Sequence, residues 1–245
     1  MIKTVGLILN TYPYSESSLI LKIISWDHGP ISIIAKGIRR KQESLMRFGE
    51  YEFQLYPPKE EGLYLLKDHA LIRDFSSYPS PQSWAAADCG LELFSKIFFP
   101  QPDNREYYTL ITEYLKYLQK TKHNGILIFW RMFSRLLKMM GVPLNFSNCA
   151  ICTKECQPLA YNPSGEPICA DCKATLPFDH AYRDLSSSAQ KIITLLPEIG
   201  NHLEEIKVNQ VDITQINELF LFHYSSMQKQ NMKLKSLNVL CQFYP

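Results

Sequence analysis

Four cysteines, arranged as two close pairs, are the residues of this chain best suited to chemistry. Cys149 and Cys152 form one C-x2-C pair, and Cys169 and Cys172 form a second pair after 16 intervening residues. Each pair can present two thiolates to one cation through a tight turn, and four thiolates fill the tetrahedral coordination that Zn2+ prefers. The spacing therefore predicts a structural zinc site; a mononuclear iron centre or two disulfides would use the same residues.

The sequence around these cysteines indicates how the pairs could meet. Residues 162–167, NPSGEP, supply turn residues between the two pairs. A fifth thiol, Cys156, follows Cys152 in a C-x3-C spacing and could act as a substitute ligand, although a spare thiol beside the site is the simpler interpretation. We expect the metal site to form an insertion at about residues 145–180.

Composition and charge limit the classes of protein that this chain can represent. With 46% hydrophobic residues among 245, the chain can bury a large core, and its net charge is only +2. The N-terminal sequence lacks the apolar region of a signal peptide, and no apolar run reaches the length of a membrane-spanning helix. The sequence therefore predicts a cytoplasmic protein, and in that reducing environment clustered cysteines favour metal over disulfides.

Sequence motifs of common enzyme classes are missing. The chain contains no G-x-x-x-x-G-K-[ST] phosphate loop, no G-x-G-x-x-G, no H-E-x-x-H and no G-x-S-x-G. Asp27, Asp68 and Asp74 could form a nuclease-like acidic cluster only if the fold gathered them. We therefore predict a protein that binds its partners and is not an enzyme.

The first part of the chain, residues 1–78, has the pattern of a small β-barrel. Five short apolar segments between about residues 5 and 75 are separated by turn signals such as DHGP and YPPKEEG. In YEFQLY, residues 51–56, apolar and polar residues alternate, which gives one buried and one solvent-facing side. So few strands suit a closed barrel of the five-stranded oligonucleotide-binding (OB) type.

The remainder, residues 79–245, has the periodicity of an α-helical domain. Helices are predicted over 84–99, 105–120 and 126–140, and again from SSSAQKIITLL and DITQINELFLFHYSSMQK, where Asp212 and Gln215 could form a capping box. The expected fold is α+β and multidomain, an OB-fold barrel followed by a helical domain that carries the four-cysteine element.

A basic cluster within the predicted barrel suits contact with phosphates. The segment AKGIRRKQESLMR, residues 35–47, sets five cations against the single acid Glu43. Lys and Arg displace the counterions condensed on nucleic acids, so such a loop on an OB barrel predicts DNA binding. Tyr12, Tyr14 and Trp26 could stack on bases, although packing within the barrel is the preferred interpretation for Trp26 and at least one tyrosine. The candidate DNA-binding residues are Lys36, Arg39, Arg40, Lys41 and Arg47.

A second basic stripe follows one face of the helix predicted at 126–140. Arg131, Arg135 and Lys138 recur at steps of four and three, and no acid in the segment neutralises them. Lys235 belongs to a C-terminal tail without Asp or Glu after Glu218. The stripe is either a solvated helix face or a docking site for an acidic peptide or for further DNA.

The order of several short motifs resembles the RecO family of recombination mediators. The opening VGLILNTYPYSESSLILKIISWDHGPISIIAKGIRR is similar to the start of that family, and the similarity continues through LLKMMGVPLNFSNCAIC, the second cysteine pair and LKSLNVLCQF. It spans nearly the whole chain. Two positions depart from the family pattern: Ile38 stands where Ala is common, and Leu237 stands where Arg usually follows LKS, which takes a cation from the C-terminal region.

The resemblance implies a function as well as a fold. A RecO protein binds single- and double-stranded DNA, anneals complementary strands, and acts with RecR to load RecA onto DNA coated by single-stranded DNA-binding protein. The acidic C-terminal tail of that coating protein is the implied ligand of the basic stripe, here Arg131, Arg135, Lys138 and Lys235. A zinc-stabilised adaptor whose barrel binds a peptide, and a metal-dependent nuclease, remain as alternatives.

Overall fold

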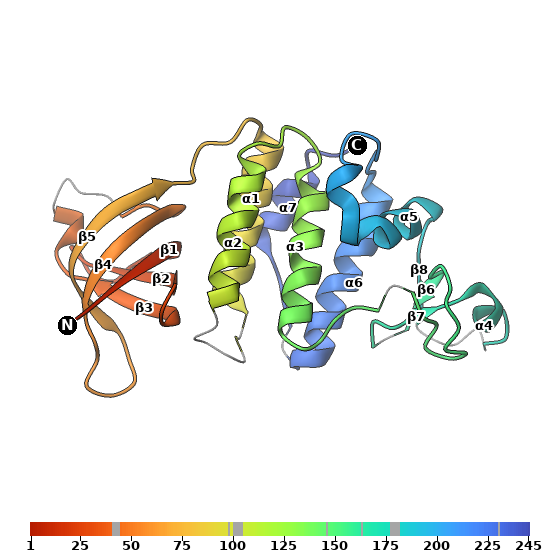
Figure 1. The fold of residues 1–245 in the computed structure, drawn as a ribbon, viewed down its shortest axis with the longest axis horizontal. Helices are drawn as coiled ribbons and strands as arrows, with labels where there is room; N and C mark the ends of the chain where they lie inside the picture. Colours follow the sequence, from red (N-terminus) through yellow and green to blue (C-terminus); the bar gives the residue numbers. More distant parts are fainter. Residues whose placement is uncertain are drawn as a thin grey trace. The chain divides into compact units, whose positions relative to one another are not determined.

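The chain forms two compact units, residues 1–122 and residues 123–245. The computed structural model describes residues 1–40, 45–97, 99, 105–145, 147–162, 164–176, 182–229 and 231–245. Figure 1 shows the strands β1 to β5 in the N-terminal unit and most of the helices in the C-terminal unit. Within the described ranges, no helix is long and apolar enough to cross a membrane.

Five strands at the N-terminus close into a barrel. Their order around the barrel is β1-β2-β3-β5-β4, with β3 and β5 parallel and the other neighbours antiparallel. This arrangement confirms the predicted OB-like barrel. The strands are β1 (Ile2–Pro13), β2 (Leu19–Ser25), β3 (Gly29–Ala35), β4 (Gly49–Tyr56) and β5 (Tyr64–Asp74), with a short 3-10 helix, η1 (Ile38–Arg40), between β3 and β4.

Alternation along β4 fills the barrel interior as the sequence predicts. Tyr51, Phe53 and Leu55 are buried in one apolar cluster, while the residues between them face outward. Gly6 of β1 leaves room for this core, because a Cβ atom there would lie 2.7 Å from Cδ1 of Ile23. A β-bulge follows Ile8 and shifts the register of β1 against β2.

Two helices pack against the outside of the barrel within the N-terminal unit. Helix α1 (Pro81–Lys96) contacts β1, and α2 (Arg105–Leu118) contacts β3. Helix α1 begins at Pro81, before the predicted start at Trp84, because the Ser80 side chain accepts a hydrogen bond from the backbone of Ser83 at 3.1 Å and caps the helix. The sequence divides the chain at residue 78, but these two helices belong to the same compact unit as the barrel.

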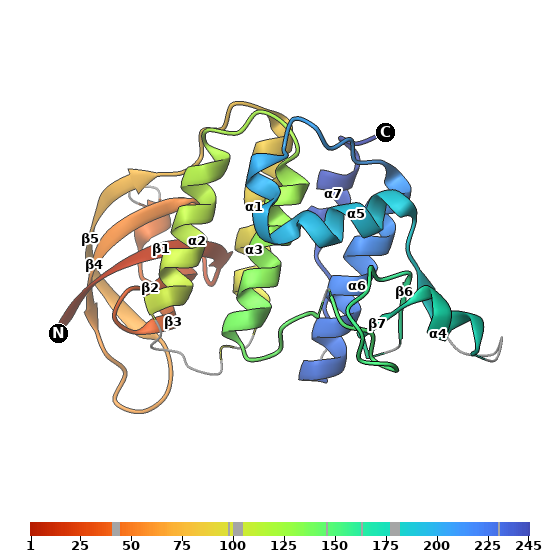
Figure 2. The same cartoon turned by 45° about the vertical axis from the view of Figure 1, so that its right-hand side comes forward.

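The C-terminal unit is built around α3 and α6. Phe133 of α3 stacks on Phe220 of α6 at 5.2 Å, and Nε1 of Trp130 donates to Oδ1 of Asn217 at 2.8 Å. Figure 2 shows α5 lying across α6, and these two helices pack together. The elements are α3 (Gly125–Met139), α5 (Ser187–Leu195), the 3-10 helix η2 (Leu196–Asn201), α6 (Gln210–Gln228) and α7 (Lys235–Cys241).

The start of α6 differs from the sequence prediction. The capping box joins Asn209 and Asp212, not Asp212 and Gln215: the Asn209 side chain accepts from the backbone of Asp212 at 3.0 Å, and the Asp212 carboxylate accepts from the backbone of Asn209 at 3.3 Å. Gln215 instead accepts from the backbone of Ser186 at 2.8 Å. The helix therefore begins earlier, because Asn209 is itself a favourable N-cap residue.

The cysteine-bearing segment forms a small element of its own within the C-terminal unit. Its three strands have the order β7-β6-β8. A single-turn helix, α4, starts at the second cysteine pair. The bounds are β6 (Ala160–Tyr161), β7 (Pro167–Ile168), α4 (Ala170–Ala174) and β8 (Arg183–Asp184).

Candidate metal centre and nucleic-acid interface

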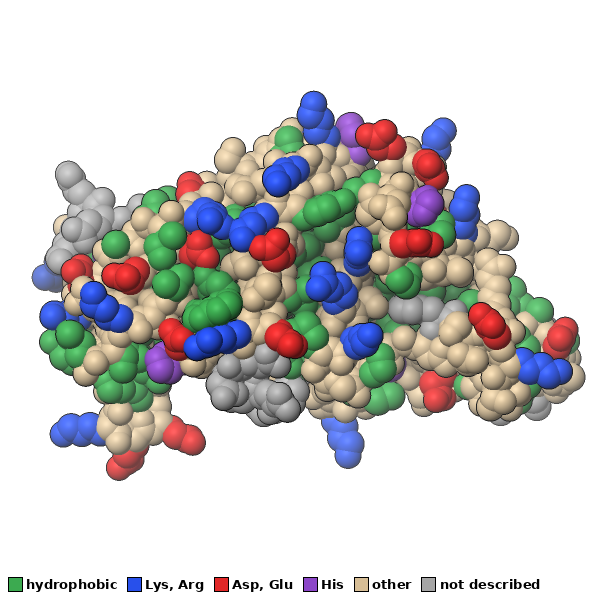
Figure 3. Space-filling model, in the orientation of Figure 1, with side chains coloured by type: hydrophobic (Ala, Val, Ile, Leu, Met, Phe, Trp, Pro, Cys, Tyr) green, Lys and Arg blue, Asp and Glu red, His purple; other side chains and the backbone are tan. Residues whose placement is uncertain are grey.

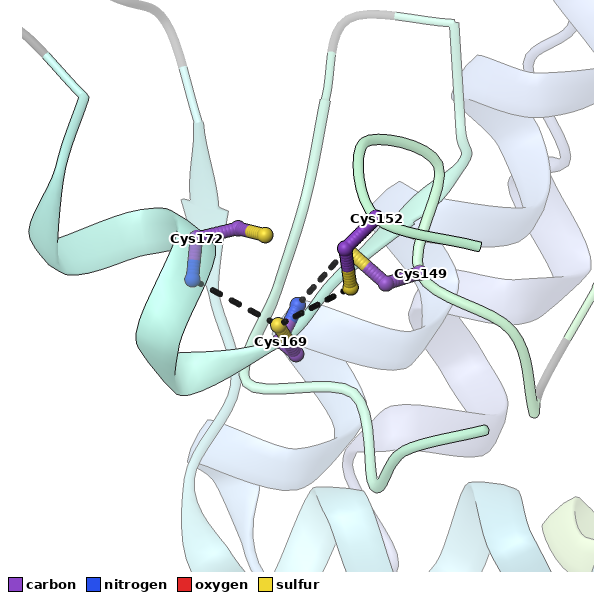
Figure 4. Close-up of side chains that lie close together, drawn as sticks. All are labelled: Cys149, Cys152, Cys169 and Cys172. Atoms are coloured by element: carbon purple, nitrogen blue, oxygen red, sulfur yellow. Dashed lines mark hydrogen bonds between the residues drawn. The ribbon is translucent and has the colours of Figure 1, made fainter. Parts of the chain in front are cut away.

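The fold gathers the four predicted metal ligands at one point. Their sulfur atoms all lie within 4.8 Å of one another, and the Sγ atoms of Cys152 and Cys169 are 3.8 Å apart. A tetrahedron with metal–sulfur bonds of about 2.3 Å has edges of about 3.8 Å, so this spacing suits a zinc-type ion. In Figure 4 one pair comes from a loop and the other from the start of α4, and the sulfurs converge.

Backbone amides surround this sulfur cluster with hydrogen-bond donors. The N–H of Cys169 and that of Ile151 donate to Sγ of Cys149 at 3.4 and 3.5 Å, and the N–H of Cys172 donates to Sγ of Cys169 at 3.4 Å. Burial raises the pKa of Cys149, but these amide donors outweigh burial and bring its pKa to about 6. Cys149 is thus prepared to be a thiolate, the form that binds metal.

The fifth thiol lies beside the cluster and outside its four-sulfur group. Burial raises the pKa of Cys156, and the neighbouring cysteines raise it further. Its backbone N–H donates to the carbonyl of Ser147 at 2.6 Å, which places it at the exit of the first cysteine loop. The geometry agrees with the simpler interpretation of Cys156 as a spare thiol next to the site.

A buried histidine ties the cysteine element to α6. Nε2 of His223 lies 3.0 Å from the carbonyl oxygen of Val142, and Nδ1 lies 3.3 Å from that of Ser164. A second tie is the ion pair between Arg183 and Glu218. Sequence reasoning missed His223, because its partners are 59 and 81 residues away and no local pattern marks them.

Three of the predicted DNA-binding cations lie exposed in the segment after β3. Lys36 follows the strand directly, and Arg39 and Arg40 end η1. The backbone N–H of Arg39 donates to Ser17 at 3.0 Å, and its Nη1 donates to the carbonyl of Ser15 at 2.8 Å. The segment is therefore held against the loop between β1 and β2, which with the strand 2–3 face is the part of an OB barrel that commonly meets oligonucleotides.

Among the described residues, one acid pairs with these cations. Glu16 lies 4.0 Å from Arg40, but both side chains are mostly exposed, so this pair is weak. Lys41 lies outside the described residues.

The last predicted cation of this cluster, Arg47, occupies a different environment. Its Nη1 donates to the carboxylate of Asp88 on α1, and its Nε donates to the carbonyl of Leu9 at 2.9 Å. The side chain is 30% exposed and lies 5.6 Å from the ring of Phe48. These contacts give Arg47 a role in holding α1 to the barrel, and we leave it out of the proposed DNA surface.

The aromatic residues named as stacking candidates are not packed inside the barrel. Tyr12 and Tyr14 are both exposed, so the expectation that at least one of them packs within the barrel is wrong. Trp26 is partly exposed; its ring meets Tyr108 of α2 edge-on at 5.5 Å and lies 5.2 Å from the guanidinium of Arg105. Trp26 therefore packs between the barrel and α2 instead of within the barrel.

The acidic residues do not form a nuclease-like cluster. Asp27 pairs with Arg105 at 3.1 Å, while Asp68 and Asp74 lie on β5, opposite Gln54 and Gly49. The four cysteines are the only group of metal-binding residue types that the structure brings together within its described ranges.

The basic stripe lies on the less buried face of α3. Arg135 and Lys138 are exposed and Arg131 is half-buried, and among the described residues none of the three pairs with a carboxylate. Figure 3 shows Lys and Arg side chains interspersed with hydrophobic ones over the region of α3. Lys235 is exposed at the start of α7, and Leu237 is buried in it. Leu237 therefore belongs to the core of the unit.

Comparison with known proteins divides the chain near residue 78, as the sequence pattern does. A family model described as recombination protein O N terminal matches residues 1–75, and one described as recombination protein O C terminal matches residues 79–237. The chain is 24% identical over 232 residues to the DNA repair protein RecO of Thermodesulfovibrio yellowstonii, covering 90% of each chain. It is 27% identical over 192 residues to the DNA repair protein RecO of Clostridium novyi, covering 74% of this chain and 72% of the relative.

Proposed function

The chain belongs to the RecO family of DNA repair proteins, and we propose on that premise that it is a recombination mediator that binds DNA through its N-terminal barrel. In this proposal it binds single and double strands and anneals complementary ones. With RecR it helps load RecA onto DNA coated by single-stranded DNA-binding protein. The protein acts by binding and not by catalytic turnover.

The observation that carries the proposal is the exposed position of Lys36, Arg39 and Arg40 on an OB-like barrel. Cations on such a loop contact the phosphate backbone, which has the same spacing of charge whatever the sequence. Contact through phosphates leaves base edges free to pair. A protein that holds two strands in this way can therefore promote annealing without unwinding or cutting them.

We also propose that the four-cysteine site holds zinc in a structural role. Zn2+ would join the loop of Cys149 and Cys152 to the start of α4, where Cys169 and Cys172 lie. All four positions of a tetrahedral ion are then taken by thiolates, so no position is left for a substrate. The support for this role is the cluster geometry and the amide donors around it.

A second proposed function concerns the basic stripe on α3. Arg131, Arg135 and Lys138 form no ion pair with an acid in the described part of the chain, which favours an acidic ligand. The acidic tail of the DNA-coating protein fits such a surface, because its carboxylates can meet guanidinium groups directly. In that case the C-terminal unit would bind the coating protein, and the barrel would bind the DNA that this protein coats.

The decisive experiment measures the salt dependence of DNA binding. The Arg39→Ala/Arg40→Ala protein should bind labelled oligonucleotides more weakly than wild type, and the slope of log affinity against log salt should fall by roughly two. A matched control is Lys120→Ala/Lys122→Ala, which removes two exposed charges after α2 in the same unit. Equal slopes for the folded double variant and wild type would refute this placement of the DNA site, and annealing rates should follow the same ranking.

A further inference from the structure

Two exposed tyrosines lie next to the cations of the barrel. Tyr12, near the end of β1, exposes 41% of its surface, and Tyr14, in the following loop, exposes 58%. The backbone N–H of Tyr14 donates to Ser18 at 3.0 Å, and Arg39 donates to the carbonyl of Ser15 in the same loop at 2.8 Å. The aromatic rings and the cations therefore belong to neighbouring parts of one barrel surface.

Strand register places Tyr12 on the outer face of the barrel. Thr11 pairs with Leu21, a residue of the barrel core. Because alternate residues of a strand point to opposite faces, Asn10 and Tyr12 point outward. Lys22 of β2 pairs with Asn10 and lies on the same outer face.

Two of these neighbours orient the ring of Tyr12. Nδ2 of Asn10 donates to its hydroxyl at 2.9 Å, and Nζ of Lys22 lies 5.9 Å from its ring centroid. A cation at that distance favours one face of an aromatic ring. The exposed part of the ring can meet a flat ligand, and the cation adds positive charge beside it.

The bulge in β1 separates this surface from the part that the helices cover. Before it, Leu7 is fully buried and lies outside the barrel-core cluster, and α1 packs against this strand. The bulge follows Ile8 and shifts the register, and beyond it the outer positions change from buried at Leu7 to half-buried at Asn10 and exposed at Tyr12. Lys22, beside the Tyr12 ring, also donates to the carbonyl of Ser95 in α1 at 3.5 Å, so Tyr12 lies at the edge of the face that α1 covers and is itself exposed.

We propose that Tyr12 and Tyr14 form a stacking surface for the bases of single-stranded nucleic acid, with its phosphates on Lys36, Arg39 and Arg40. This inference rests on the proposed DNA-binding function and specifies its ligand. Aromatic rings beside a basic groove are the usual means by which proteins bind single strands without reading their sequence.

The two kinds of contact distinguish single strands from duplex. In a duplex the bases are stacked on each other and only phosphates and groove edges are available, whereas a single strand can turn its bases onto the tyrosines. Loss of one stacking ring should weaken single-strand binding by about 5- to 150-fold. Loss of a cation should instead weaken binding to every nucleic acid and lower its salt dependence.

The test compares three labelled probes of equal length by fluorescence anisotropy: a thymidine oligonucleotide, an abasic deoxyribose-phosphate oligomer and a duplex. Tyr12→Ala should weaken binding of the thymidine probe and leave the other two unchanged, and Tyr12→Phe should stay close to wild type because the ring is kept. Tyr14→Ala should act in the same direction. The matched control is Tyr56→Ala, since Tyr56 is 44% exposed on β4 near the other end of β1.

The outcomes separate this inference from the proposed function. If wild type binds all three probes and folded Tyr12→Ala and Tyr14→Ala bind the thymidine probe as wild type does, the stacking surface is refuted while DNA binding stands. If Tyr12→Ala weakens all three probes equally, its effect is not base stacking and the inference also fails. If wild type binds none of them, the proposed function fails as well.

Discussion

Arg47 donates to the carboxylate of Asp88, and this pair joins the segment just before β4 to the middle of α1. The carboxylate side chain is only 16% exposed, and Arg47 also donates to the carbonyl of Leu9 at 2.9 Å. A residue that belongs to a basic run in the sequence is therefore a structural link in the folded protein. Its substitution should affect stability more than DNA binding.

Arg47→Ala should destabilise the N-terminal unit by about 1–3 kcal/mol, because it leaves the largely buried Asp88 carboxylate without its partner. Urea unfolding measures this loss. Arg40→Ala is the matched control, since Arg40 and Glu16 form an exposed pair whose removal should change stability by less than about 0.5 kcal/mol. The slope of log DNA affinity against log salt should be the same in Arg47→Ala as in wild type. If the slope falls as it is expected to fall in Arg39→Ala/Arg40→Ala, Arg47 contacts DNA after all.

The same pair predicts a pH dependence. Burial raises the pKa of Asp88 above its usual value, and the Arg47 guanidinium counters only part of that rise. A carboxyl with a higher pKa in the folded state contributes most stability below its unfolded pKa, and this contribution falls as pH rises to the folded pKa. Arg47→Ala removes the charge that opposes this rise, so the pKa of folded Asp88 should be higher still in the variant. The decline in the variant's stability should therefore extend to higher pH than in wild type. Urea unfolding across a pH series should show this, and the additional change Asp88→Asn should abolish it; identical pH profiles for Arg47→Ala and wild type would contradict the argument.

Sequence periodicity was sufficient to predict the barrel and the main helices, because burial of alternate or helically spaced residues is a local pattern. Tyr51, Phe53 and Leu55 illustrate this for β4. The cysteine cluster could be predicted because ligand spacing is local within each pair. Arg47 and His223 could not be assigned in this way, since their roles depend on partners brought near only by the tertiary fold.

Removal of the metal should destabilise the C-terminal unit and leave the barrel folded. Gently purified protein should contain about one zinc per chain, and chelation or Cys169→Ser should lower the stability of residues 123–245 on the order of 4 kcal/mol, because metal binding and local folding are coupled. Metal analysis and thermal unfolding test this. Cys156→Ser, which changes a thiol beside the cluster, should keep both metal and stability; equal loss in this control would make Cys156 a ligand.

His223 should stabilise the cysteine element from outside the metal site. A Cβ atom on Gly165 would lie 2.7 Å from Nδ1 of His223, and Gly165 has a φ of +78°, so the histidine and this turn fit closely. His223→Ala should cost about 1–3 kcal/mol, because it removes a buried imidazole and its hydrogen bonding to the backbone of the cysteine element, and should speed zinc release to a chromogenic chelator. His123→Ala, at an exposed histidine of the same unit, should change neither quantity. Unaltered release from His223→Ala would mean that the element holds its geometry without this contact.

The stripe on α3 leads to the last prediction, which concerns an acidic peptide. Arg135 and Lys138 are exposed and Arg131 is half-buried on one face, so a peptide with several carboxylates and an apolar end should bind and should weaken as salt rises. Arg131→Ala/Arg135→Ala should reduce its affinity about tenfold or more, because two charge-assisted hydrogen bonds are lost. Titration of a fluorescent acidic peptide measures this, with Lys191→Ala/Lys207→Ala as a control that removes the same charge elsewhere in the unit. If both double variants lose affinity equally, net charge and not the stripe attracts the peptide; if neither loses it, the docking site lies on another face of the C-terminal unit.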